Sequence, residues 1–170
     1  IVDLSPPLVG LVKDGALNDR SFQARADELR GNWAYFYDVG SGIVKYEMAV
    51  ATKEAALDCA ISKYFLECPS DTTADLVNFT DMGLLKKGLL AIPNDTDTEI
   101  ENGMEMVILV RATDAMGHSV IGSSDGFVLD LTPPICGEVY VGPFEGTHLD
   151  WQKSKTQISA NWDNFRDPES

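Results

Sequence analysis

Short stretches of alternating apolar and polar residues, separated by Gly, Pro, Asn and Asp, make up most of the chain. This alternation is typical of half-buried β-strands, and the regularly spaced turn residues favour an all-β fold built as an antiparallel sandwich. The pattern predicts strands at residues 8–13, 29–36, 43–51, 104–113 and 119–131. The last two are expected to form a hairpin, because Gly117 lies between them and can adopt the positive φ that such turns often need.

The period of two also assigns side chains to faces. One face of the second predicted strand carries Leu29, Gly31, Trp33 and Tyr35. The inward face of the third predicted strand is expected to carry Val44, Tyr46, Met48 and Val50. Trp33 is expected to anchor the core.

Residues 53–67 break this alternation. The segment is rich in Ala and Leu and has few β-branched residues, which predicts a short helix within an insertion at about 53–73. Cys59 and Cys68 bracket part of this segment, and a disulfide between them would hold the insertion in place. The alternative is a pair of free, buried thiols.

The chain contains an internal repeat. Residues 2–15 (VDLSPPLVGLVKDG) match residues 129–142 (LDLTPPICGEVYVG) at an offset of 127, and residues 29–41 match residues 158–170 at an offset of 129. We therefore predict one complete repeat at 1–132 and the first strands of a second, incomplete repeat at 133–170. Because isolated strand pairs are marginal in water, the second repeat should be completed by further chain or by a partner. Any partner of Cys136 should lie in that missing part.

The formal net charge of −14 at pH 7 narrows the classes of molecule that the chain could bind. Such a charge repels a phosphate backbone and an anionic membrane surface, which argues against nucleic-acid binding. The apolar runs, such as Met106–Val110, are far shorter than the roughly 20 residues that cross a bilayer, so we expect no membrane insertion by this segment.

Two N-glycosylation acceptor triplets begin at Asn78 and Asn94. Both fall in predicted loops or edge strands. Together with the cysteine spacing they favour an extracellular location, secreted or at the cell surface. The alternative is that both are ordinary turn asparagines.

Three features stand out as motifs: Trp33 and Tyr46 on neighbouring strands, residues 100–117 (IENGMEMVILVRATDAMG), and residues 124–134 (SDGFVLDLTPP). Together they resemble the tandem fibronectin type III-like repeats of extracellular proteins, with a Trp-x-x-Phe-x-Asp-x-x-Ser-Gly-Ile-x-x-Tyr signature and Asp-x-Ser/Thr-Pro-Pro linkers. The resemblance implies an immunoglobulin-like β-sandwich and a chain of similar modules. Met106 departs from the family pattern, because a Tyr usually stands there and its hydroxyl ties back to the preceding turn. Independently of the family, consecutive prolines stiffen the entry to each repeat.

A search for reactive chemistry gives little. His118 and His148 lie at turn-like positions, no nucleophile or phosphate-binding motif is present, and the cysteine and histidine spacing does not suit zinc. Calcium prefers carboxylate oxygens, and Asp38, Asp114 and Asp130 could meet at one end of the sandwich. The alternative is a solvated acidic surface.

The leading interpretation is a non-enzymatic structural or adhesive module that serves a matrix, adhesion or filament assembly. Its expected partners are other repeats of the same protein, neighbouring copies in an assembly, or an extracellular protein or glycan. The alternative is a ligand-binding ectodomain that recognises carbohydrate or protein through the insertion, where Tyr64 and Phe65 are the obvious aromatic contacts. Enzymatic activity ranks third, and no cofactor other than calcium is expected.

Overall fold

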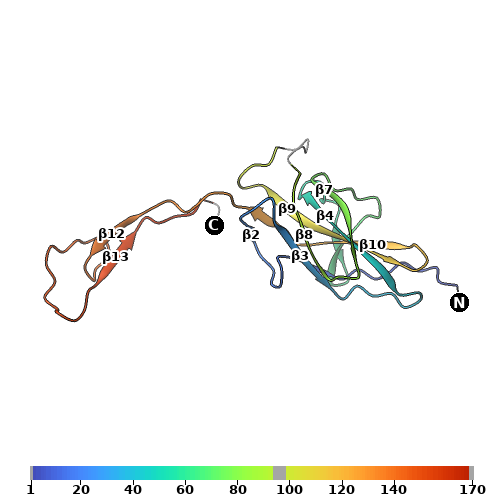
Figure 1. Cartoon of the computed structure of the whole chain (residues 1–170), viewed down its shortest axis with the longest axis horizontal. Coiled ribbons are helices and arrows are strands. Elements are labelled where there is room, and N and C mark those ends of the chain that lie inside the picture. Colours follow the sequence, from blue (N-terminus) through green and yellow to red (C-terminus); the bar gives the residue numbers. More distant parts are fainter. Residues whose placement is uncertain (1, 94–98, 169–170) are drawn as a thin grey trace. The chain divides into compact units, whose positions relative to one another are not determined.

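The structure is a computed structural model that describes residues 2–93 and 99–168 (Figure 1). It divides into two compact units, Ile1–Leu131 and Thr132–Ser170. The described residues form strands and turns and contain no helix, so the all-β prediction is confirmed. The part of the chain that is described accordingly holds no helix that could span a membrane.

The larger sheet of the first unit is built around β9 (Glu105–Asp114). One edge of β9 pairs with β4 (Ile43–Thr52), and the other pairs first with β11 (Phe127–Leu129) and then with β10 (Ser119–Ser123). Both predicted strands of the last hairpin are thus present, but the second is broken into β10 and β11. The break lies at Ser124-Asp125-Gly126, where Gly126 has a φ of 108°.

Four further strands extend this sheet. They are β7 (Val77–Gly83) on β4, β6 (Phe65–Cys68) on β10, β5 (Ala60–Ser62) on β6, and β2 (Phe22–Gln23) on β11. All of these pairings are antiparallel except β2–β11, which is parallel. The antiparallel prediction therefore holds for the sheet with one local exception.

A second, three-stranded sheet has the order β1-β3-β8, with β1 at Leu11–Asp14, β3 at Leu29–Ala34 and β8 at Lys87–Leu90. The main core draws buried side chains from both sheets, including Leu29 and Trp33 from β3 and Met48 and Ile108 from β4 and β9. Trp33 is 2% exposed, and its ring lies 5.9 Å from that of Tyr46. Full burial of each such side chain contributes about 1.5–3 kcal/mol.

The face assignments need two corrections. Tyr35 is 71% exposed, because its φ of 64° ends β3 at Ala34, and Phe36 enters the core in its place. On β4, Tyr46, Met48 and Val50 are buried as predicted, whereas Val44 is 50% exposed near the end of the strand.

The predicted helix at residues 53–67 is wrong. The segment forms turns at 53–58 and then the hairpin β5–β6, which is closed by a disulfide between Cys59 and Cys68. A lone helix of this length is marginal in water, whereas β6 gains backbone hydrogen bonds from β10. Ala56 and Cys68 pack on the outer face of the larger sheet, where the alanines of β4 are also buried.

The second unit consists of β12 (Glu138–Val141) paired with β13 (Ala160–Asp163). Its register matches that of β1 and β3 in the first unit: Val12 pairs with Trp33 and Val139 pairs with Trp162. Outside the strands, the Leu8–Tyr37 bridge recurs as Ile135–Arg166. Cys136 in this unit is an exposed free thiol.

The side-chain hydrogen bonds recur as well. Gln23 Nε2 donates to the Arg30 carbonyl and its Oε1 accepts from the Arg30 amide, and Gln152 makes the same pair of bonds with Ser159. Across the described strands, two segments 127–129 positions apart therefore adopt the same local structure.

Candidate functional site

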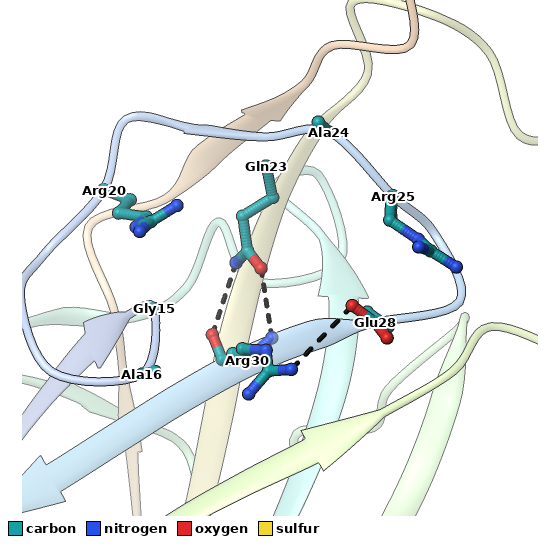
Figure 2. Close-up of a pocket in the computed structure, with 8 residues that line it drawn as sticks. All are labelled: Gly15, Ala16, Arg20, Gln23, Ala24, Arg25, Glu28 and Arg30. Atoms are coloured by element: carbon teal, nitrogen blue, oxygen red, sulfur yellow. Dashed lines mark hydrogen bonds and ion pairs between the residues drawn. The ribbon is translucent and has the colours of Figure 1, made fainter.

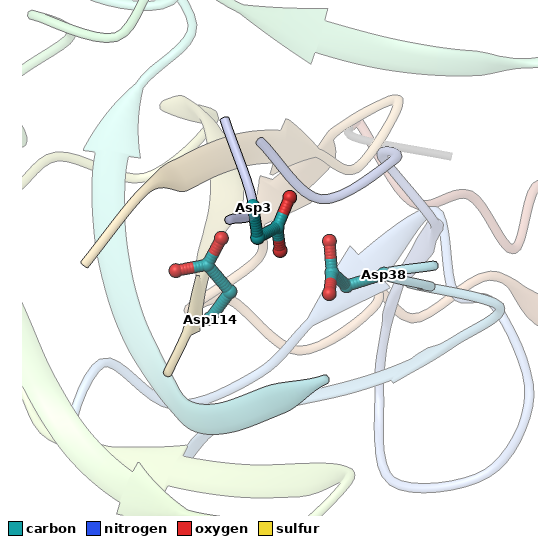
Figure 3. A group of neighbouring side chains, drawn as sticks. All are labelled: Asp3, Asp38 and Asp114. Atoms are coloured by element: carbon teal, nitrogen blue, oxygen red, sulfur yellow. The ribbon is translucent and has the colours of Figure 1, made fainter. Parts of the chain in front are cut away.

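Three aspartates meet near the start of the first unit: Asp3, Asp38 and Asp114 (Figure 3). One carboxylate oxygen from each lies within 4.8 Å of the other two. Asp114 ends β9 and is buried, whereas Asp3 and Asp38 lie in loops and are half-buried. Sequence reasoning named Asp38 and Asp114 for this place and missed Asp3.

Backbone amides already occupy most of these carboxylate oxygens. The Ser41 amide donates to Asp3 Oδ2 at 2.9 Å and to Asp38 Oδ2 at 2.7 Å. Asp114 Oδ1 accepts from the amides of Met116 and His118 at 2.8 and 2.9 Å. The three side chains thus cap loops and turns at this end of the unit.

Hydrogen bonds also favour the charged form of two of these aspartates, Asp114 and Asp3. Burial opposes the charge on Asp114, but hydrogen bonds from the His118 ring and from the amides of His118 and Met116 outweigh it and lower the pKa of Asp114. The amide of Ser5, followed by hydrogen bonds from Ser41, lowers the pKa of Asp3. All of these contacts favour the charged carboxylates without an added ion.

Two of these aspartates recur in the second copy of the repeat. Asp130 stands 127 positions after Asp3, and Asp167 stands 129 positions after Asp38. Asp130, the third residue that sequence reasoning proposed, is not a member of the cluster, and its amide donates to the Gln23 carbonyl at 3.0 Å. The signal that could have identified Asp3 was its equivalence to Asp130.

Neither family models, curated proteins nor solved structures gave a match to the chain. Function is therefore inferred from the geometry of the described residues.

The disulfide hairpin is the most exposed apolar feature of the first unit's insertion. Ile61 is 76% exposed and Tyr64 is 86% exposed, next to the positive φ of Lys63 in the hairpin turn. Phe65 is turned inward by comparison and stacks on Tyr35, with ring centroids 6.2 Å apart and an angle of 7° between the ring planes. Of the two aromatic side chains proposed as ligand contacts, Tyr64 is the available one.

A shallow pocket lies beside β2 and the start of β3 (Figure 2), and sequence reasoning did not identify it. Its rim carries Arg20, Arg25 and Arg30, a local basic group in an acidic chain. Arg25 pairs with Asp27 at 2.8 Å and Arg30 pairs with Glu28 at 3.8 Å. Local ion pairs thus compensate much of this positive charge.

The glycosylation triplets differ in what can be said of them. Asn78 is exposed on β7, which among the described strands pairs only with β4, and the Thr80 hydroxyl donates to the Asn78 carbonyl at 3.0 Å. The side chain is accessible to a modifying enzyme. Asn94 lies outside the described residues.

Proposed function

We propose that the chain is a non-enzymatic structural module of a secreted or cell-surface protein built from tandem fibronectin type III-like repeats. The observation that supports this most strongly is the shared register of the two units, in which Val12–Trp33 and Val139–Trp162 occupy equivalent positions. A tandem repeat of one strand pattern is typical of proteins that span distance and present surfaces.

Two further observations support an extracellular setting. The Cys59–Cys68 disulfide is of the kind that persists in oxidising compartments. The acceptor triplet at Asn78 is exposed on an edge strand, where a glycan would block pairing with another chain. An array of this kind would act through its spacing and its surfaces, with stiff Pro-Pro entries at 6–7 and 133–134. Its partners would be other repeats, neighbouring copies, or an extracellular protein or glycan.

The test is peptide mapping of the protein from its natural source, combined with localisation by an antibody raised against the first unit. We expect an extracellular antigen, a glycan on the peptide that contains Asn78, and a disulfide-linked Cys59–Cys68 peptide under non-reducing conditions. An unglycosylated, reduced protein inside the cell would overturn the proposal.

A second candidate function is ligand recognition by the disulfide hairpin, since Ile61 and Tyr64 offer exposed apolar surface at its tip. The two functions separate in a binding screen against extracellular glycans and matrix proteins. Ligand recognition predicts a binder whose affinity falls about tenfold or more in Tyr64→Ala, as expected for an aromatic contact at the centre of an interface. The exposed Leu57→Ala in the neighbouring turn serves as the matched control.

A further inference from the structure

A second acidic group in the first unit differs from the first in having a buried carboxylate oxygen without a hydrogen-bond partner among the described residues. Asp14 ends β1 and is completely buried, with 0% of its surface exposed. The Gly126 amide donates to Asp14 Oδ2 at 3.1 Å, whereas Asp14 Oδ1 has no hydrogen-bond partner within residues 2–93 and 99–168. A buried charged oxygen that lacks a partner is costly, because burial removes its hydration and nothing replaces it.

Two more carboxylates face the buried one. One oxygen from each of Asp14, Asp19 and Asp125 lies within 4.8 Å of the other two, and Asp19 and Asp125 are exposed. Asp19 Oδ1 also accepts a hydrogen bond from the Asp14 amide at 3.0 Å. The group therefore opens from a buried base towards solvent.

No Lys, Arg or His pairs with any of these three aspartates among residues 2–93 and 99–168. The nearby ammonium of Lys53 lies close to Gly126 but forms its ion pair with Glu105, at 3.4 Å. Three carboxylates thus come together without a compensating cation from the described chain.

The ionisation of Asp14 reflects this setting. Burial, helped by the negative charges of Asp125 and Asp19, raises the pKa of Asp14 to about 7. The Ser124 hydroxyl and the Gly126 amide lower this pKa, but only partly, and the hydroxyl does not complete a hydrogen bond to Oδ1. A bound cation would offset both the loss of hydration on burial and the repulsion from the neighbouring negative charges.

The internal repeat shows that this strand pairing does not require the carboxylate. The residue equivalent to Asp14 in β12 is Val141, and both stand in the same register, since Asp14 pairs with Gly31 and Val141 with Ala160. The recurring aspartates at 3 and 130 contrast with this, because they appear in both copies. The carboxylate at position 14 is a departure from the repeat pattern and calls for a reason other than strand pairing.

We infer that Asp14, Asp19 and Asp125 form a calcium-binding site. All three donors are carboxylate oxygens, which suit a hard divalent cation and not zinc or copper. Calcium accommodates irregular sets of six to eight oxygens, and the exposed side of the group leaves room for water to complete the shell. The ion would join the turn after β1 to the break between β10 and β11.

The test uses the full 170-residue chain, freed of metal with a chelator and titrated with CaCl2 by isothermal titration calorimetry. Thermal unfolding with and without calcium gives a second readout. Because extracellular calcium modules bind at about 10⁻⁴–10⁻³ M, the titration should extend to about 10 mM. We expect one calcium per chain and a rise in the unfolding temperature of about 5 °C at about 10 mM CaCl2.

The variants Asp14→Asn and Asp125→Asn should each weaken calcium binding about tenfold or more, because each removes a ligand charge. Asp125 is exposed, so Asp125→Asn keeps the test valid even if Asp14→Asn does not fold. Asp71→Asn removes the same charge at an exposed position in neither group and should bind as the unaltered chain does. Asp38→Asn should also retain binding.

Three results would overturn the inference. The first is no binding up to about 10 mM, in the range where such sites bind. The second is binding that survives in Asp125→Asn but is lost in Asp38→Asn, which would move the ion to the other cluster. The third is an equal response to MgCl2 and CaCl2 in both the unaltered chain and Asp125→Asn, which would indicate a general ionic effect.

Discussion

Reduction of the Cys59–Cys68 disulfide should lower the free energy of unfolding of the first unit by about 2.6 kcal/mol. The two cysteines are nine positions apart, and closing a loop of that length removes about 8.7 cal/mol/K of entropy from the unfolded chain. At 298 K this entropy corresponds to the stated free energy. Reduction leaves both sulfur atoms in place, so the apolar packing around Cys68 is retained.

The assay is urea unfolding with and without a thiol reductant, followed by tryptophan fluorescence. Trp33 is 2% exposed and reports the first unit, whereas Trp151 and Trp162 are 88% and 66% exposed and should change little. With a denaturant slope of about 1–3 kcal/mol/M, the midpoint should move by about 0.9–2.6 M. The background variant Cys136→Ala removes the exposed thiol and prevents links between chains.

Coincident midpoints for the oxidised and reduced protein would refute the reasoning. Amide hydrogen exchange would then show why. Loss of protection confined to β5 and β6 would mean that the hairpin opens by itself and that its loop entropy is not coupled to unfolding of the sheets. The double variant Cys59→Ala/Cys68→Ala should behave as the reduced protein does, apart from the small loss of buried sulfur.

Three other predictions follow from burial and hydrogen bonding. Asp14→Val, which copies Val141 of the second unit, should raise the free energy of unfolding by about 1–3 kcal/mol in calcium-free urea titrations at pH 8. A free energy of unfolding below that of the unaltered chain would contradict the cost assigned to the buried charge. The pKa of Asp114 is lowered on folding, so its contribution to stability is present above pH 4 and is lost as pH falls through the folded pKa. Asp114→Asn should therefore flatten the acid side of a plot of unfolding temperature against pH. Gly10→Ala would place a Cβ against the Ala34 carbonyl oxygen and should destabilise the first unit by about 1–3 kcal/mol in the same urea assay. An unchanged midpoint would mean that the backbone shifts at little cost.

Burial could be predicted from the sequence where the period of two along a strand alone decides which face a side chain occupies. Met48 and Val50 were assigned to the core by alternation alone, and both are fully buried. The same rule failed for Tyr35, because its positive φ reverses the alternation of faces. A tyrosine in the sequence gives no indication of a positive φ. It also treated Ala49 as outward-facing, whereas the inserted segment covers that face and buries it.

The candidate sites depended on contacts between distant parts of the chain. The helix prediction at 53–67 followed local propensity, which the pairing of β6 with β10 overrides. Asp14 and Asp125 meet although 111 positions separate them along the chain, and no local pattern connects them. The internal repeat could have drawn attention to Asp14, because it aligns with Val141 and the two copies therefore differ in charge at this position.

The common register of the two strand pairs has a consequence for how such a chain folds. Because β1 pairs with β3 in the same way that β12 pairs with β13, β1 can also pair with β13 without loss of the backbone ladder. Exchange of this kind between neighbouring repeats is a known hazard of repetitive chains, and it traps misfolded intermediates. The proposed calcium site would limit it: in a β1–β13 pair Asp14 would stand opposite Ala160, away from the Gly126 amide and from the two aspartates that would share the ion with it. Because the buried carboxylate is unfavourable by itself, a bound calcium ion would be what helps each repeat to select its own strands.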